Sequence, residues 1–512
     1  MKNINKIAGL ILLFLCVITE SLIAQAKMGS MADQITIEID LLDNADQPLL
    51  NKELSVRLSI ATFGSDISIA PRKVYTTILS TDKPFKISLP STTNFTYVHF
   101  EFEGMEKRGF LNNYYIFEKG DSVKCRVSGN SYEFYGKGAE KLNCQSEMYD
   151  LQYRSGVKES KLYRDKQYET LFRVTKKILD SIFELQVEIV NKHAIKLGRK
   201  MTEIMLANAY GNRYAPNISS VIMSSRINDR NLLPAFLKSD AYRSIDMSLN
   251  QKLDPTILIS STTYCNFLLE KITAENSIDP KSLTLRSKIE MPTFVFNAIK
   301  NNHRGLLREK LLAMFFLRYK DYSISYPYLD EAISYVENTE IKDILLNIKD
   351  TRTKGVAFFP FELEDTNGTT IRLSDFSGKV VVLDFWYTGC TNCIILHEGM
   401  KPIVEKFKNN PKVEFVSVSV DKDKLAWLKS VASGKYTDPQ SLNLYTSGLG
   451  TSHSLIEKYN IRSYPTQFVL KNGTVFSSSP PRLGPAFTNN IEARSAFISL
   501  IEEALRDNYF LP

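Results

Sequence analysis

Two cysteines separated by two residues, Cys390-Thr391-Asn392-Cys393, carry the most visible chemistry in the sequence. The apolar run 380–386 before them predicts a buried strand, and residues 394–408 after them predict a helix. A cysteine pair at a junction of strand and helix suits reversible dithiol/disulfide exchange. Half of a zinc site is the alternative, but such a site needs roughly four ligands. Because the sequence holds no second CxxC and no close Cys/His cluster, we interpret the pair as redox-active.

The chain that must position this pair is long enough for several domains. Its 512 residues suggest about three domains at roughly 150 residues each. From 33 to 138 the apolar residues alternate with polar ones, as in Ile35, Ile37 and Ile39, which predicts an antiparallel β-sandwich. From 139 to 352 the apolar spacing is helical, with no repeat of fixed length, and predicts a central helical region.

The third region, 355–512, predicts an α/β domain. A hairpin around Asn367-Gly368 comes first. The strand 380–385, the cysteine pair and its helix, the strand 413–420 and the helix 424–431 follow. A second hairpin around Asn472-Gly473 and a helix over 491–506 close the region. This order is a thioredoxin-like arrangement, so the whole chain is predicted to be a multidomain α+β protein.

The first 26 residues are predicted to be a signal peptide. Lys2 and Lys6 precede an apolar stretch over 7–18, and Ala24-Gln25-Ala26 provides a small-residue cleavage site. The apolar stretch is about 12 residues, short for a bilayer span. Cys16 lies within it without small residues before it, so we favour a cleaved signal over a lipid anchor and predict export to a periplasm or cell envelope.

Charge and the remaining cysteines exclude other classes of protein. The net charge is +7, and no basic run is interleaved with stacking aromatics, so nucleic-acid binding is not predicted. Cys125, Cys144 and Cys265 are too few for a disulfide scaffold in a chain of this size. Cys125 and Cys144 could pair, but we interpret all three as buried free thiols. No nucleotide-binding loop or HExxH motif is present.

Several motifs of the third region resemble one family. They are the segment 373–380, Asp384-Phe385-Trp386, the CTNC pair and Tyr464-Pro465-Thr466. Together they resemble the TlpA/ResA-like exported thiol–disulfide oxidoreductases of the thioredoxin superfamily, which are related to AhpC/TSA proteins. The resemblance covers about 355–512 and implies a thioredoxin-like fold, with the first 350 residues as an N-terminal extension.

The two cysteines have different predicted roles. Cys390 stands where the helix begins, so unsatisfied backbone N–H groups and the positive end of the helix dipole favour its thiolate. It is therefore the predicted nucleophile. Cys393, about one turn further on, would resolve the mixed disulfide by attacking Cys390.

The resemblance implies roles for four further residues. Asp384 lies six residues before Cys390, where thioredoxins carry a buried acid that assists proton transfer at the second cysteine; a hydrogen-bonded structural acid is the alternative. Tyr464-Pro465 matches the cis-proline of the family, whose loop binds an extended substrate segment. Trp386 is the expected neighbour of the pair. Trp386, Tyr464 and Pro465 are therefore the predicted substrate-binding residues.

The sequence also departs from the family pattern. Many relatives have Trp just before the first cysteine and Pro between the two, where this chain has Gly389 and Thr391-Asn392. The reduction potential therefore cannot be transferred, and the residues alone permit reduction, oxidation or isomerisation. His397, one helical turn after Cys393, is interpreted as a surface residue.

We thus predict an exported thiol–disulfide oxidoreductase. The resemblance implies that it reduces disulfides of envelope proteins and receives electrons from a membrane thiol oxidoreductase. No metal and no small-molecule cofactor is predicted. One alternative is a copper-binding metallochaperone that uses Cys390, Cys393 and His453. The other is a partner-binding envelope module with a regulatory redox unit. A peroxiredoxin is disfavoured because neither cysteine has the Thr-x-x-Cys feature.

Overall fold

The computed structural model describes most of the chain, in thirteen stretches. They are residues 34–42, 53–61, 72–80, 85–90, 95–102, 114–128, 131–154, 160–282, 284–287, 290–320, 327–439, 441–483 and 491–507. The predicted signal peptide, 1–26, lies outside the described residues. No helix in the described stretches has the length and hydropathy needed to cross a membrane.

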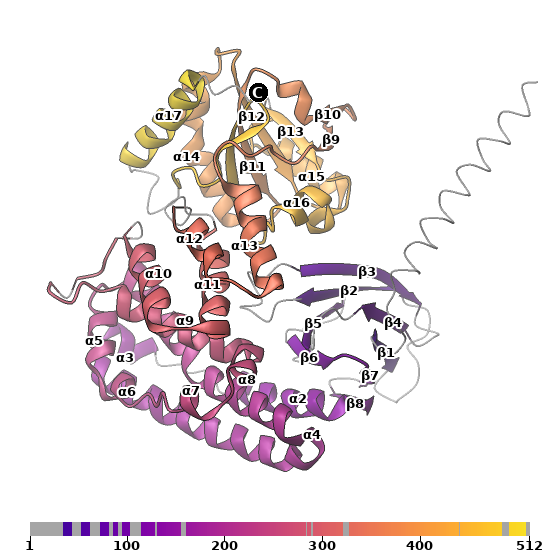
Figure 1. The fold of residues 1–512 in the computed structure, drawn as a ribbon. Helices are drawn as coiled ribbons and strands as arrows, with labels where there is room; N and C mark the ends of the chain where they lie inside the picture. Colours follow the sequence, from indigo (N-terminus) through magenta and orange to yellow (C-terminus); the bar gives the residue numbers. More distant parts are fainter. Residues whose placement is uncertain are drawn as a thin grey trace, which may run out of the picture. The chain divides into compact units, whose positions relative to one another are not determined.

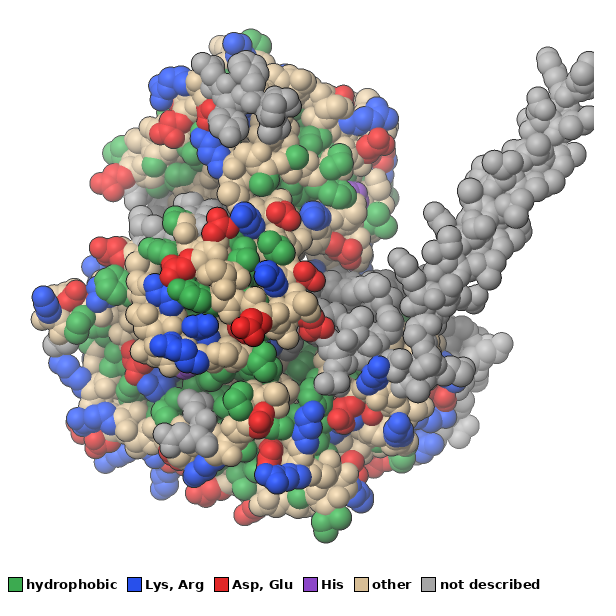
Figure 2. All heavy atoms as spheres, in the orientation of Figure 1, with side chains coloured by type: hydrophobic (Ala, Val, Ile, Leu, Met, Phe, Trp, Pro, Cys, Tyr) green, Lys and Arg blue, Asp and Glu red, His purple; other side chains and the backbone are tan. Residues whose placement is uncertain are grey.

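The described residues divide between two compact units. The first takes those within 1–64, 73–164 and 174–213, and the second takes those within 65–72, 165–173 and 214–512. On the face drawn in Figure 2, Lys and Arg side chains are interspersed with Asp and Glu side chains in both units, in keeping with 64 basic and 57 acidic residues.

Two four-stranded sheets make up the β structure of the first unit. One has the order β4-β1-β7-β8, and the other has the order β3-β2-β5-β6. The strands of the first sheet are β1 (Gln34–Leu42), β4 (Phe85–Pro90), β7 (Ser122–Ser128) and β8 (Ser131–Lys137). Those of the second are β2 (Glu53–Ala61), β3 (Arg72–Ser80), β5 (Phe95–Phe102) and β6 (Tyr114–Glu118).

The first sheet is mixed, so the predicted antiparallel sandwich is not confirmed. β1 pairs with β7 in parallel, whereas β1 with β4 and β7 with β8 are antiparallel. Parallel pairing requires a long crossover connection, and about 80 residues separate the end of β1 from the start of β7. Alternation of apolar residues predicts which face of a strand is buried, and it does not specify strand direction. Ile35, Ile37 and Ile39 are indeed buried on one face.

Helices dominate from residue 139 to residue 352. The helices up to Ile227 are α2 (Ala139–Arg154), α3 (Ser160–Arg164) and α4 (Tyr168–Ile227). Later helices are α5 (Leu232–Lys238), α6 (Asp240–Arg243), α7 (Leu249–Lys252), α8 (Pro255–Ser260), α9 (Thr262–Asn276), α10 (Met291–Asn302), α11 (Gly305–Tyr319), α12 (Leu329–Ser334) and α13 (Thr339–Arg352). α4 is kinked at Gly198, whose φ of 72° and ψ of 168° are not helical.

A seven-stranded sheet forms the centre of the region after α13. Its order is β10-β9-β13-β12-β11-β14-β15. The strands are β9 (Glu362–Asp365), β10 (Thr370–Arg372), β11 (Val380–Trp386), β12 (Val413–Ser419), β13 (Leu442–Tyr445), β14 (Thr466–Lys471) and β15 (Thr474–Ser477). The helices are η4 (Leu373–Phe376), α14 (Thr391–Phe407), α15 (Lys424–Ala432), η5 (Gly450–Ser452), α16 (Ser454–Lys458) and α17 (Ile491–Arg506).

The two faces of the sheet have separate apolar cores. Val381, Leu383 and Phe385 of β11 pack on one face with residues of α16. Val380 and Val382 pack on the other face with residues of α14 and α17, and Figure 1 shows both helices on that side of β11. β11, β12 and β13 are parallel, so their carboxyl ends meet at one edge, where α/β sheets bind their ligands.

Candidate active site at the Cys390–Cys393 pair

The cysteine pair lies at the carboxyl edge of the sheet, where the chain passes from β11 to α14. Cys390 is the N-cap of α14, and its Sγ accepts a hydrogen bond from the backbone N–H of Cys393 at 3.1 Å. The preceding turn uses Gly389 at a φ of 97°, a conformation that favours glycine. Cys390 and Cys393 are joined by a disulfide, and both are buried. The structure is therefore that of the oxidised pair.

Aromatic side chains enclose the disulfide. Trp386, at the end of β11, packs in one buried cluster with both cysteines. Its indole N–H donates a hydrogen bond to Ser417 Oγ at 2.5 Å, which satisfies its buried donor. Its ring stacks on Tyr436, whose hydroxyl oxygen accepts a hydrogen bond from the Gly389 N–H at 2.9 Å.

The Tyr464-Pro465 loop borders the same cluster. The peptide bond between these residues is cis, and Tyr464 packs against the cluster that holds the cysteines. The ring of Tyr464 meets the ring of Tyr387 edge to face, with centroids 5.4 Å apart. Since Tyr387 is 41% exposed, this pair of rings brings apolar surface to solvent beside the disulfide.

An acidic residue that the sequence reasoning missed holds the turn before the cysteines. Asp421 Oδ1 accepts a hydrogen bond from the Thr388 N–H at 2.8 Å, and its Oδ2 accepts one from the Thr388 hydroxyl at 2.7 Å. Ser419 Oγ donates to the same carboxylate at 2.9 Å. The position of Asp421 just beyond the carboxyl end of a parallel strand was the available signal.

Asp384 lies on β11, six residues before Cys390 in the chain, on the face of the strand that packs against α14. Its partners in register are Ser417 on β12 and Gln467 on β14. Burial raises the pKa of the Asp384 carboxyl well above its ordinary value, and a hydrogen bond from the Phe385 backbone opposes the shift. Among the described residues, none hydrogen-bonds to Asp384 Oδ1. A carboxyl group in this state is suited to proton transfer.

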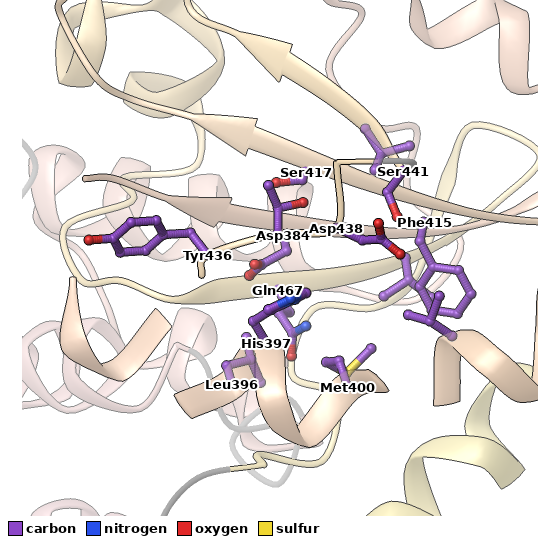
Figure 3. A pocket seen from close by; sticks show the side chains of 14 residues that line it. Asp384, Leu396, His397, Met400, Phe415, Ser417, Tyr436, Asp438, Ser441 and Gln467 are labelled. Carbon is purple, nitrogen blue, oxygen red and sulfur yellow. The ribbon is translucent and has the colours of Figure 1, made fainter. Parts of the chain in front are cut away.

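The side chain of Asp384 lines a small pocket of about 60 Å³. Figure 3 shows its carboxyl group, Gln467 and His397 extending into this space. The pocket explains why the residue keeps some exposed surface although its carboxyl oxygen is buried. His397, predicted to be a surface residue, is instead half-buried in the pocket wall.

The structure does not bring His453 to the cysteines. His453 is the N-cap of α16, and its Nδ1 accepts a hydrogen bond from the Leu455 N–H at 3.2 Å. Across the described parts of the chain, no three His, Cys, Asp or Glu side chains are grouped closely enough to hold a metal ion. The copper site of the alternative hypothesis is therefore not assembled.

Three other cysteines lie among the described residues, and they take no part in the disulfide. Cys125, Cys144 and Cys265 are buried and carry no disulfide. Burial raises the pKa of Cys144 to about 12 and that of Cys265 to about 11. Their thiols are consequently poor nucleophiles at neutral pH.

Comparison with known proteins agrees with this geometry. Residues 378–475 match a family model described as thioredoxin-like. The C-terminal region of the chain is thus a thioredoxin-like domain, on the combined evidence of this match, the sheet order and the disulfide.

The matching curated proteins are named thiol-disulfide oxidoreductase ResA. A stretch of 110 residues is 34% identical to ResA of Bacillus subtilis (strain 168), covering 22% of this chain and 57% of that protein. A stretch of 116 residues is 32% identical to ResA of Geobacillus kaustophilus (strain HTA426), covering 22% and 62%. The predicted resemblance to ResA-like proteins is confirmed, while the chain spans less than two thirds of the length of these relatives.

One similar solved structure is a putative thiol:disulfide interchange protein DsbE from Chlorobium tepidum. It is 24% identical, and the match covers 30% of this chain and 99% of that chain with a TM-score of 0.25.

Proposed function

We propose that the protein is a thiol–disulfide oxidoreductase that reduces protein disulfides with the Cys390/Cys393 dithiol. The observation that carries the proposal is the disulfide between the N-cap and the third residue of α14, at the edge of a thioredoxin-like sheet. An N-cap sulfur receives backbone N–H groups and the positive end of the helix dipole. Both favour a thiolate at Cys390 once the disulfide is reduced.

The reaction has two exchange steps. The Cys390 thiolate attacks one sulfur of the substrate disulfide, and the other substrate sulfur leaves as a thiolate. Cys393 then loses its proton to the Asp384 carboxylate and attacks Cys390 Sγ. The mixed disulfide breaks, the second substrate thiolate leaves, and the Cys390–Cys393 disulfide seen in the structure remains.

Tyr464, Pro465 and Trp386 are proposed to shape the substrate groove. Tyr464 and Trp386 belong to the aromatic cluster around the disulfide. Tyr387 is exposed and Tyr464 is half-buried, and such rings next to a sulfur suit an extended segment that carries apolar side chains. Trp386 is fully buried and would shape the groove by supporting it from beneath. A folded substrate would therefore expose such a segment before its disulfide is reduced.

The compartment and the electron source follow from the sequence and the resemblance. We propose that residues 1–26 are a cleaved signal peptide and that the protein acts in a periplasm or cell envelope. Each turnover leaves the pair oxidised, so a thiol reductant must return two electrons. A membrane thiol oxidoreductase is the proposed donor.

The extension is proposed to consist of two further domains. Residues 33–138 would form a β-sandwich from the two small sheets, and 139–352 a helical domain, ahead of the redox domain at 355–512. One buried face on β1, with Ile35, Ile37 and Ile39, supports a sandwich because sandwiched sheets bury one face each. Comparing the whole chain with the fragment 355–512 on several protein substrates tests whether the extension selects them.

Substitution of the cysteines tests the proposed chemistry. Cys390→Ser should abolish reduction of a protein disulfide, whereas Cys125→Ala, at a buried thiol far along the chain, should retain it. Cys393→Ala should instead accumulate a mixed disulfide on Cys390, which mass spectrometry detects and which identifies the substrate. Turnover by Cys390→Ser at the wild-type rate would overturn the assignment.

A further inference from the structure

The pocket beside Asp384 is also lined by two other titratable side chains, His397 and Asp438. β11 contributes Asp384, its neighbours in register contribute the neutral Ser417 and Gln467, and α14 contributes His397 (Figure 3). The loop after α15 contributes Asp438. A volume of about 60 Å³ is more than the roughly 15 Å³ that one water molecule needs.

The carboxyl group of Asp384 needs such a space to exchange protons. Its Oδ1 is buried and has no hydrogen-bond partner among the described residues, although a buried carboxyl oxygen is costly to leave unpaired. The lining includes apolar side chains such as Leu396 and Phe415 as well as polar ones. The polar side chains and the unpaired oxygen together meet the conditions under which such a space holds water. Water in the pocket would bond Asp384 and connect it to the opposite wall.

Charged groups of α14 and of the loop after α15 act on the His397 imidazole. Burial lowers the pKa of the His397 imidazole, and Lys401 on α14 acts in the same direction. Glu398 on α14 and Asp438 on the loop oppose this shift, as does a hydrogen bond with the Gly434 backbone. The ring is consequently neutral at pH 7 and able to accept a proton.

We propose that His397 exchanges protons with Asp384 through water in this pocket and thereby connects the buried carboxyl group to solvent in each turnover. The inference rests on the function proposed above. It assigns to His397 a positioning and relay role, in which the imidazole acts on the cysteines only through Asp384.

The proton balance of the relay is closed. In the resolving step the Cys393 thiol gives its proton to the Asp384 carboxylate, and the electron pair of the broken mixed disulfide leaves with the substrate sulfur. The protonated Asp384 then passes a proton to pocket water, which passes one to the neutral His397 ring. The imidazolium releases its proton to bulk solvent, and both side chains return to their starting states.

The test measures the resolving step in the full-length protein. The mixed disulfide between Cys390 and a model peptide is formed, and its decay is followed by stopped flow from pH 5.5 to 9. His397→Gln should slow the decay about tenfold at pH 7, less than the 10²- to 10⁴-fold typical of losing a direct general acid or base. It should also remove the imidazole ionisation from the pH profile.

A matched histidine and a double variant separate relay from structure. His453 is likewise half-buried, and burial lowers its pKa, but it lies outside the pocket lining. His453→Asn, which keeps an N-cap side chain, should leave rate and pH profile unchanged. His397→Gln combined with Asp384→Asn should be no slower than Asp384→Asn alone, because residues that act in series are not additive.

The outcomes distinguish this inference from the proposed function. If His397→Gln has the wild-type rate and pH profile, or slows Asp384→Asn by a further tenfold, the relay is overturned. In either case the redox assignment stands as long as Cys390→Ser is inactive. If Cys390→Ser remains active, the proposed function fails first and the relay fails with it.

Discussion

The rings of Trp386 and Tyr436 are stacked with their centroids 5.1 Å apart and their planes 9° from parallel. Trp386 ends β11, and Tyr436 lies in the connection between α15 and β13. The Tyr436 hydroxyl oxygen also accepts a hydrogen bond from the Gly389 N–H. One side chain therefore ties the end of the strand to the turn immediately before Cys390, so the position of the nucleophile depends on a residue 46 positions later.

Tyr436→Phe should loosen this turn without removing the stacked ring. The lost hydrogen bond should lower the free energy of unfolding by about 1 kcal/mol, and less if water replaces the hydroxyl at Gly389. The reduced Cys390 should react about two- to fivefold more slowly with iodoacetamide at pH 7, because its N-cap geometry is less well held. Alkylation kinetics and urea unfolding measure the two effects.

Tyr445→Phe is the matched control. Tyr445 stacks on Trp427 with ring planes 10° from parallel, and its hydroxyl donates to the Lys422 carbonyl at 2.7 Å. The substitution should cost a similar free energy and leave the alkylation rate of Cys390 unchanged. An equal loss of rate in both variants would show that the link through Gly389 has no specific effect.

The parts of the site that sequence could predict are local in the chain. The apolar run of β11, Cys390 at the start of α14 and the cysteine spacing lie within about fifteen residues, so periodicity and capping rules reach them. Asp384 could be placed in the strand because the same run contains it. The thioredoxin-like order of elements followed from the spacing of strands and helices after residue 355.

The parts that sequence could not predict depend on residues brought together across the chain. Tyr436 and Asp421 contact the turn before Cys390 from separate loops, and no periodic pattern marks a loop residue. His397 was interpreted as a surface residue, but the structure places it half-buried in the pocket wall. Its burial depends on the loop that carries Asp438. The parallel pairing of β1 with β7 likewise depends on a connection, which apolar alternation does not encode.

Asp384→Asn should stabilise the protein at neutral and alkaline pH. The pKa of Asp384 is raised by burial in the folded state, so the folded protein binds more protons than the unfolded chain above pH 4. Stability therefore falls as pH rises from about 4 to the folded pKa, by roughly 1.4 kcal/mol for each unit between the two values. The side-chain amide of the Asp384→Asn variant carries no charge at any pH, so the variant does not lose this part of the free energy of unfolding as the pH rises.

Urea unfolding of both proteins at pH 4 and pH 8 measures the effect. At pH 4 the variant and the wild type should agree within about 0.5 kcal/mol, and at pH 8 the variant should be the more stable. A variant that is less stable than the wild type at pH 8 would mean that Asp384 is held as a stabilising carboxylate.

Arg352→Met should destabilise the thioredoxin-like domain, although Arg352 precedes it in the chain. The guanidinium is buried, donates to the Tyr459 carbonyl at 2.6 Å and lies 4.8 Å from the centroid of the Phe468 ring. The loss of a charge-assisted hydrogen bond should cost about 2 kcal/mol. Thermal unfolding measures it.

Arg372→Met is the control for Arg352. Arg372 pairs with Glu362 at 3.0 Å, and both side chains are exposed, so its loss should cost less than about 0.5 kcal/mol.

The contacts of Arg352 also lead us to expect that a fragment beginning at residue 339 unfolds at a higher temperature than one beginning at 355. Equal melting temperatures of the two fragments would contradict a stabilising role of α13.

Lys310→Met should change how stability depends on pH. Lys310 lies on α11 and is 4% exposed. Burial lowers its pKa to about 8, while Cys265 and Glu340 oppose the shift. Between about pH 8 and the unfolded value near 10.4 the folded protein binds fewer protons than the unfolded chain. Wild-type stability should therefore rise with pH in this window, and below pH 8 the buried charge lowers stability throughout.

The methionine variant should lack this rise. At pH 7 the free energy of unfolding of the variant should exceed that of the wild type by up to roughly 3 kcal/mol. The polar contacts that the ammonium makes in the wild type reduce this difference, which should also shrink towards pH 10. Lys177→Met, at an exposed lysine of α4, should differ from the wild type by less than about 0.5 kcal/mol at every pH. Chemical unfolding from pH 7 to 10 provides the comparison. Parallel curves for Lys310→Met and the wild type would show that Lys310 does not titrate in this window, because the ammonium would then be stabilised by its neighbours as well as it is by water.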